Sequence, residues 1–149
     1  MFNSKVKSRG RVDIYLNGVH VRCIENMVVT TGHEFITSRM KDATADVMTH
    51  MAIGTNTTAA ALGDTTLGTE VARVALNVSG GVVSGNTITY EATFPADVPD
   101  VTDPDKTPVT EVGLFNAASG GTMLAHAIFA VVNKGELDPM TVSWVITNE

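Results

Sequence analysis

The chain of 149 residues has the length of one domain, and a globule of this size buries roughly two-thirds of the surface of its unfolded chain. Its net charge of −6 argues against a protein that binds nucleic acid through overall charge. The single cysteine excludes an internal disulfide, and no apolar stretch reaches the roughly 20 residues of a membrane helix. We therefore expect a soluble, single-domain protein made in a reducing cytoplasm. Its abundant Thr, Ala, Val and Gly favour strands and tight turns.

The first eleven residues form a basic segment that precedes the first acid of the chain. Its basic residues are Lys5, Lys7, Arg9 and Arg11. We expect residues 1–11 to be either a solvated terminus or an arm that docks on an acidic neighbour, because they contain too few apolar side chains to bury themselves. Residues 12–149 are expected to form the folded domain.

The segment VDIYLNGVHVRCIE predicts a β-hairpin. Asn17 and Gly18 suit a two-residue type I′ turn, in which both positions need positive φ. An uninterrupted register from this turn pairs Asp13 with Arg22, and the opposite charges of the two side chains support that register. The same register places Cys23 on the apolar face. Cys23 is therefore expected to be a small buried hydrophobe and not a nucleophile.

One substantial helix is expected at about residues 31–45, from the segment TTGHEFITSRMKDAT onward. Thr31 and Glu34 have the spacing of a capping box. An apolar stripe follows at helical spacing: Ile36, Met40 and Ala43.

The rest of the chain predicts β structure. The candidate strands are EVARVALNV, TEVGLFN, TMLAHAIFAVV, MTVSWVIT and a second hairpin, GVVSGNTITYEATF, which turns at Gly85 and Asn86. Alternation in the last two segments points Tyr90 and Trp144 inward. Six or more short strands with one helix predict an antiparallel β-sandwich with an N-terminal hairpin and a helix across one end.

A run of small residues, NAASGGT, raises the possibility of a phosphate-binding loop. Such a loop needs a lysine after its glycines and a helix that begins there, whereas MLAHAIFAVV follows here and alternates like a strand. The run is therefore expected to be a hairpin tip, whose residues are Ala118, Ser119, Gly120 and Gly121.

No pattern of catalytic residues stands out. The four histidines are dispersed without the spacing of a zinc site, and there is no G-x-S-x-G motif. His126 lies in a predicted strand and is expected to be hydrogen-bonded or at the surface. We expect no enzyme, no cofactor and no small-molecule substrate.

The segment PADVPDVTDPDKTP, residues 95–108, is a proline-rich acidic loop. Its acids are Asp97, Asp100, Asp103 and Asp105. Carboxylates at this spacing suit calcium, although the glycine and the terminal glutamate of an EF-hand are absent. A loop that contacts a basic neighbour is the favoured interpretation, and the calcium site remains the alternative.

Two blocks, MAIGTNTTAAALGDTTLGTEVARVAL and EVGLFNAASGGTMLAHAIFAVVNKGELDPMTVSWVIT, resemble a family of small structural proteins of tailed bacteriophages. Members of that family are head-decoration, tail-fibre-like or collar components. The resemblance runs from about Thr31 to the C-terminus, and its signature elements are AIGTxTT, DTxLGxEVAR, GLFNAASGGTML and VNKG…TVxW. The acidic loop and the basic N-terminal segment are longer than such proteins lead us to expect.

The resemblance implies a non-enzymatic virion protein, foremost one that decorates and stabilises the capsid. Its expected partners are other copies of itself, as a trimer, and major capsid or other virion proteins, without nucleic acid or membrane. The hairpin turn at residues 17–18, the tip at residues 118–121 or the acidic loop is expected to reach the neighbouring subunits. The alternatives are a tail, neck, collar or baseplate component, including a fibre-anchoring module. A carbohydrate-binding module is less favoured because aromatic residues make up 5% of the chain. The position in the virion, the copy number and the host stay open.

Overall fold

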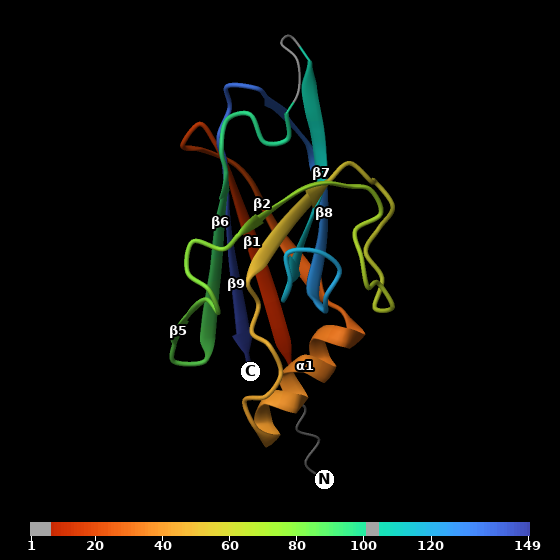
Figure 1. Ribbon diagram of the computed structural model, residues 1–149, viewed down its shortest axis with the longest axis vertical. Coiled ribbons are helices and arrows are strands. Elements are labelled where there is room, and N and C mark those ends of the chain that lie inside the picture. Colours follow the sequence, from red (N-terminus) through yellow and green to blue (C-terminus); the bar gives the residue numbers. More distant parts are fainter. Residues whose placement is uncertain (1–6, 101–104) are drawn as a thin grey trace.

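The computed structural model describes residues 7–100 and 105–149, in which there are nine strands and one helix (Figure 1). In chain order they are β1 Ser8–Leu16, β2 Val19–Val28, α1 Thr30–Lys41, β3 His50–Gly54, β4 Glu70–Ala75, β5 Val82–Ser84, β6 Thr87–Phe94, β7 Lys106–Phe115, β8 Met123–Gly135 and β9 Met140–Asn148. The protein is therefore mainly β, with an N-terminal hairpin and a short helix, as the sequence predicts.

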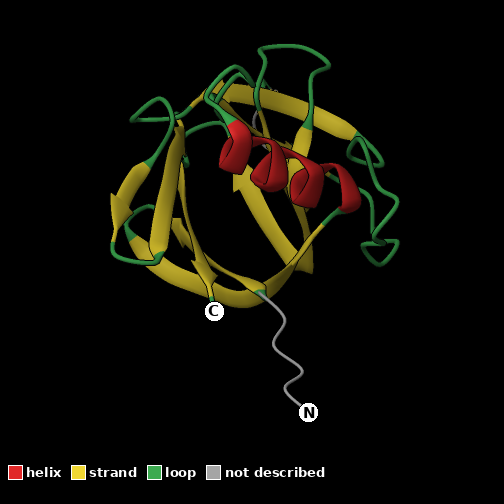
Figure 2. Ribbon diagram, turned by 90° about the horizontal axis from the view of Figure 1, so that it is seen from below, coloured by secondary structure: helices red, strands yellow, loops and turns green. Residues whose placement is uncertain are grey.

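All nine strands belong to one antiparallel sheet, in the order β4-β3-β7-β8-β2-β1-β9-β6-β5. The sheet curls around an interior, and α1 lies across one end of it (Figure 2). Its two halves meet at a short ladder between β2 and β8, in which Met27 pairs with His126 and Val28 with Ala125. The structure is therefore one curled nine-stranded sheet, a half-barrel, rather than the expected sandwich of two separate sheets.

The segment that follows β4 draws the two edges of the sheet together. The amide of Leu76 donates to the carbonyl of Thr49, which precedes β3, at 2.8 Å. The next amide, that of Asn77, donates to the carbonyl of Glu91 in β6, also at 2.8 Å. Because β3 and β6 lie near opposite edges, these two bonds support the curl of the sheet.

The interior is filled by alternate residues of the strands. The expected inward faces of β6 and β9 are confirmed. In β9 they are Met140, Val142, Trp144 and Ile146, each at most 1% exposed, and in β6 they are Ile88, Tyr90, Ala92 and Phe94. Full burial of a large apolar side chain stabilises a fold by roughly 1.5–3 kcal/mol, so these faces supply much of the driving force for folding.

The turn of the N-terminal hairpin forms as the sequence predicts. Asn17 (φ 53°) and Gly18 (φ 77°) both take the left-handed conformation that a type I′ turn requires. Leu16 pairs with Val19 directly beside the turn.

A β-bulge further along the hairpin overturns the expected register. Val21 is the additional residue, and beyond it Asp13 pairs with Cys23 instead of with Arg22. A shift of one residue exchanges the two faces of a strand, so Cys23 is exposed. The prediction that Cys23 is buried is therefore wrong.

Arg22 instead connects β2 to β8 where the two strands diverge. Its Nε donates to the carbonyl of Ala130 at 2.9 Å, and its Nη2 donates to the carbonyl of Val131 at 2.7 Å. The guanidinium thus supplies donors to a stretch of β8 that lies beyond the β2–β8 ladder.

The helix is shorter than expected and lacks its expected cap. It ends at Lys41 because the carboxylate of Asp42 accepts hydrogen bonds from the amide and the hydroxyl of Thr44, a local turn that competes with helix. At the other end, the hydroxyl of Thr31 donates to the carbonyl of Met123 at 2.7 Å, so the capping box does not form.

The first half of the helix packs against the sheet. The prediction that Ile36 and Met40 share a buried apolar stripe is wrong. A Cβ at Gly32 would clash with the carbonyl of Leu124, so glycine permits the close approach of α1 to β8. Phe35 and Ile36 pack on the core, whereas Met40 is 86% exposed. No helix in the described part of the chain is long and apolar enough to cross a bilayer.

The prediction that residues 1–11 form an arm outside the folded domain is wrong for the last residues of that segment. Arg9 and Arg11 lie in β1, which pairs with β2 on one side and with β9 on the other. Lys7 continues the pairing, because its amide and carbonyl bond to those of Glu149 at 2.7 and 2.8 Å. Lys5 lies outside the described residues.

The acidic loop ends before its expected boundary at residue 108, because β7 already begins at Lys106. Pro108 therefore lies within a strand. β3 pairs with β7 from Glu111 to Phe115, so at Pro108 the strand has β8 alone as its paired neighbour. Such edge-like positions are where strands accept proline.

Replacement of Arg22 by Met should lower the free energy of unfolding by about 1–3 kcal/mol, because backbone carbonyls of β8 lose a charged donor. Urea denaturation measures this change. The control is Arg9→Met, whose contact with Glu149 is exposed and 3.8 Å long, and it should cost less than about 1 kcal/mol. Equal effects of the two substitutions would contradict the role given to Arg22.

Candidate functional site

The outer face of β3, β7 and β8 is covered by the chain itself. Residues 55–69, which link β3 to β4, fold over this face, to the right of β7 and β8 in Figure 1. Small residues make room for them: Ala52 and Gly113 are paired neighbours, and a Cβ at Gly113 would lie 2.8 Å from the side chain of Leu67. A second, smaller core results, formed by Val29, Ala52, Leu67, Phe115 and Met123.

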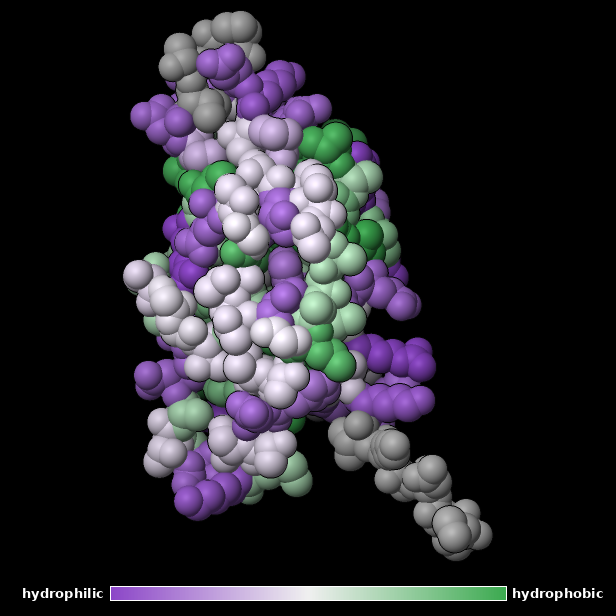
Figure 3. Space-filling model, turned by 90° about the vertical axis from the view of Figure 1, so that its right-hand side faces the viewer, coloured by the Kyte–Doolittle hydropathy of each residue, from purple (hydrophilic) through white to green (hydrophobic). Residues whose placement is uncertain are grey.

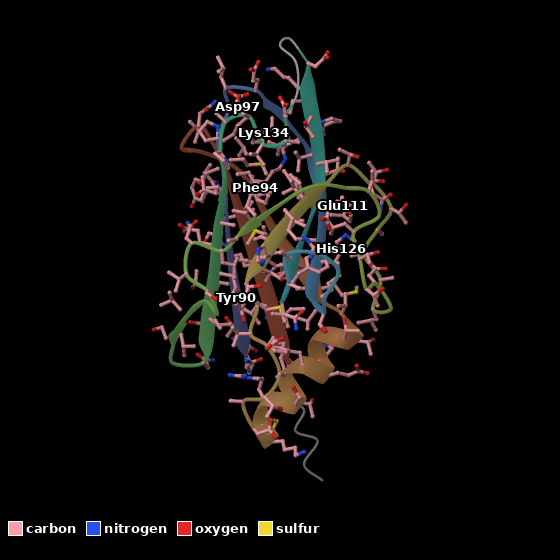
Figure 4. The ribbon with its side chains drawn as sticks, in the orientation of Figure 1. Tyr90, Phe94, Asp97, Glu111, His126 and Lys134 are labelled. Atoms are coloured by element: carbon pink, nitrogen blue, oxygen red, sulfur yellow. The ribbon has the colours of Figure 1, made fainter. Side chains whose placement is uncertain are left out.

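Three ionisable side chains meet beneath this loop: Asp64 from the loop, His126 from β8 and Glu111 from β7, the last two labelled in Figure 4. The Nδ1 of His126 donates to Oδ2 of Asp64 at 2.8 Å, and its Nε2 lies 3.8 Å from Oε1 of Glu111. Glu111 is fully buried and His126 is 3% exposed. The other oxygen of Glu111 accepts from the amide of Asn56 at 3.0 Å. We call these three residues the Asp64–His126–Glu111 row.

Some polar atoms of the row are hydrogen-bonded and others are not. Within the described residues, Oε1 of Glu111 and Nε2 of His126 have no hydrogen-bond partner. Partial burial raises the pKa of Asp64, but hydrogen bonds from the amide of Ala61 and from His126 outweigh it and hold the pKa below its ordinary value of 3.8. An acid thus orients the histidine as in a hydrolase, but a second carboxylate stands where a nucleophilic hydroxyl would be needed. The row can fasten the loop to the sheet.

The predicted hairpin tip does connect β7 to β8. Gly120 (φ 61°) and Gly121 (φ 78°) take left-handed conformations, so the glycines serve turn geometry as expected. Ala118 and Ser119 are exposed at this tip.

The side chain of Arg73 of β4 holds the hairpin tip in place. Its Nη1 donates to the carbonyls of Ala117 and Gly120, both at 2.9 Å. The guanidinium lies 3.9 Å from the centre of the Phe115 ring and pairs with Glu70 at 2.6 Å. The tip is therefore held in one conformation by a nearly buried cation.

Two of the predicted contact sites meet at one end of the sheet, which we call the loop end: residues 17–18, 95–100 and 136–139. The amide of Asn17 donates to the carbonyl of Pro139 at 3.0 Å, and its side chain donates to Oδ1 of Asp138 at 2.8 Å. The amide of Asp97 donates to the carbonyl of Glu136 at 2.8 Å. The hairpin turn, the acidic loop and the β8–β9 turn thus support one another.

A buried lysine underlies the loop end (Figure 4). Lys134 is 1% exposed, and its Nζ donates to the carbonyl of Pro95 at 2.9 Å. Burial lowers the pKa of Lys134, and the charges of Asp138 and Asp97 partly oppose this shift. The lysine therefore ties the start of the acidic loop to β8.

The opposite end of the sheet carries an apolar hollow of about 370 Å³ between α1 and the β5–β6 hairpin, which we call the α1–β6 groove. Its apolar lining is Phe35, Ile36, Val47, Val83, Ile88 and Tyr90. Burial raises the pKa of Tyr90 to about 12. On β5, at the edge of the sheet, Val82 is 55% and Val83 70% exposed.

The sequence candidates therefore do not form one site. Asp97 and Asp100 belong to the acidic loop at the loop end, and Asp105 directly precedes β7, whereas Lys7 pairs with Glu149 beside the far end of β9. Asp103 lies outside the described residues. Within residues 7–100 and 105–149, no group of three His, Cys, Asp or Glu side chains is placed to hold a metal ion.

Sequence reasoning missed the groove and most of the residues that fasten the outer layer. Glu111 and Arg73 each lie in a predicted strand, where a charged side chain is normally expected to face solvent. The face opposite each of them carries core residues, but the loops that cover the outer side are distant in sequence. For His126 alone a hydrogen bond was one of two expected alternatives, and it is confirmed, whereas the alternative of a surface position is wrong because the residue is 3% exposed.

Comparisons with known proteins found no matching family model, no similar curated protein and no similar solved structure.

The two tip glycines should differ in their tolerance of alanine. Gly120→Ala should cost about 1–2 kcal/mol of unfolding free energy, because positive φ is unfavourable for a residue with a Cβ. Gly121→Ala should cost more, because its Cβ would also lie 2.7 Å from that of Ala117. Thermal denaturation of the two variants tests this order, and a stable Gly121→Ala variant would contradict it.

The Asp64–His126–Glu111 row should add to the acid sensitivity of the fold. The lowered pKa of Asp64 means that its ionised form stabilises the protein above the unfolded value of about 3.8, and that this stability is lost as the pH falls through the folded pKa. The advantage of the wild type over Asp64→Asn in unfolding free energy should therefore be constant above about pH 5 and shrink as the pH is lowered from about 5 to below 3.8. A difference that stays constant over this range would contradict the assignment.

Proposed function

We propose that the protein is a non-enzymatic structural component of a tailed-bacteriophage virion, foremost one that decorates and stabilises the capsid. The observation that carries the proposal is the apolar surface left outside the core, with Val82 and Val83 more than half exposed beside the α1–β6 groove. Contiguous apolar surface of this kind marks sites of protein association.

The residues that carry the family resemblance support a shared scaffold role. AIGTNTT comprises the end of β3 and the first residues of the loop 55–69, and DTTLGTEVAR comprises the end of that loop and the start of β4. GLFNAASGGTML spans the β7–β8 hairpin. These segments come together in the covered outer layer, which in Figure 3 presents a largely pale middle between strongly hydrophilic ends. We infer that this layer stiffens the domain and leaves its two ends for contacts.

The partners that we propose are further copies of the chain, as a trimer, and the major capsid protein or another virion protein. The loop end suits a basic neighbouring surface, since Asp97 and Asp100 belong to it. A tail, neck or baseplate component is the second candidate, and it would use the same surfaces at fewer copies. Burial of Trp144 and Tyr90 weighs against a carbohydrate-binding module, which needs exposed aromatic rings.

The test adds the purified protein to particles that lack it. Saturable binding at many capsid sites, together with greater resistance of the particles to heat, is the result we expect. Binding confined to one vertex or to the tail would replace decoration by the second candidate. Absence of binding to any particle component would contradict a virion role.

A further inference from the structure

Leu137 is an exposed leucine on a rigid turn. It lies between β8 and β9 at the loop end and is 80% exposed. The amide of Gly135 donates to Oδ2 of Asp138 at 2.9 Å, and the amide of Asp138 donates to the carbonyl of Gly135 at 3.1 Å. Asn17 binds the same turn from the neighbouring hairpin. Because the turn is held by these polar bonds, the leucine is displayed in a fixed position and loses little freedom on docking.

The α1–β6 groove has the complementary character. Phe35 and Ile36 form its wall on α1, and Val83 and Ile88 form its wall on β5 and β6. Its volume of about 370 Å³ falls in the range of small binding pockets and is large enough for a leucine side chain.

The charges around the two sites also match. Arg39 is the one charged residue in the groove lining, and within the described residues it forms no ion pair with a carboxylate. Leu137 is flanked by Glu136 and Asp138. The carboxylate of Asp138 is already bound by Asn17 and Gly135, which leaves Glu136 as the acid available to a neighbour.

We propose that Leu137 of one copy inserts into the α1–β6 groove of a second copy, with Glu136 facing Arg39 of that copy. The turn and the groove lie at opposite ends of the molecule (Figure 1), so a chain cannot fill its own groove. The contact is head-to-tail, and it builds a ring or an open row according to the rotation between copies. It rests on the self-assembly part of the proposed function and names the surfaces that make it.

Two variants of the full chain test the contact. Leu137→Asp removes the inserted side chain, and Val83→Asp places a carboxylate at the rim of the groove. Sedimentation velocity over a range of concentrations should show that the wild type associates and that each variant does so at least about tenfold more weakly. An equimolar mixture of the two variants should form a 1:1 dimer, because one retains the groove and the other the leucine. A monomeric wild type, or variants that do not complement, would overturn the proposal.

Two controls separate this contact from other effects. Leu62→Asp alters a leucine that is 56% exposed on the loop 55–69, and it should leave association unchanged. Glu136→Arg and Arg39→Glu should each weaken association, and their combination in one chain should restore it. Circular dichroism confirms that each variant is folded. If the variants still bind particles while self-association is absent in the wild type, the head-to-tail contact fails and the virion role stands.

Discussion

The short ladder between β2 and β8 is the contact on which the arrangement of the molecule depends. Two pairs, Met27 with His126 and Val28 with Ala125, join a five-stranded half of the sheet to a four-stranded half. Beyond the ladder β2 and β8 have no backbone pairing, and the side chain of Arg22 bonds to carbonyls of β8 instead. The bulge at Val21 turns the side chain of Arg22 toward β8. The α1 helix follows β2 directly and closes the end of the curl.

The covered outer face is the second consequence of this architecture. Because the loop 55–69 covers the outer face of β3, β7 and β8, two ionisable side chains on that face, Glu111 and His126, are buried. Buried polar groups are costly unless they are hydrogen-bonded, and the bond from His126 to Asp64 and the bond from the amide of Asn56 to Glu111 hold the loop in one position. The loop makes the outer face of β3, β7 and β8 unavailable to a partner, and we propose contacts at the two ends of the sheet instead.

Local signals predicted the elements, and long-range contacts decided what the sequence could not show. The Asn17–Gly18 turn and the glycine-rich tip follow from φ preferences of single residues, and both are confirmed. The bulge that exposes Cys23 is associated with bonds from Arg22 to residues more than 100 positions away, which no hairpin pattern contains. The helix end was predictable in principle, because Asp42 and Thr44 form a local turn, but the apolar stripe obscured it. The burial of Glu111 depends on the loop 55–69, which comes from another part of the chain.

The proposed contacts join the two ends of the sheet to neighbouring subunits or other virion proteins. Amide hydrogen exchange of the protein bound to virus particles, compared with that of the free chain, tests these contacts most directly. The account predicts slower exchange of amides in the β5–β6 hairpin and around residues 135–139. Amides of the loop 55–69 should exchange at the same rate in both states, because that loop is already fastened by the Asp64–His126–Glu111 row. Protection confined to the loop 55–69 or to the tip at residues 116–122, with both ends unchanged, would contradict it.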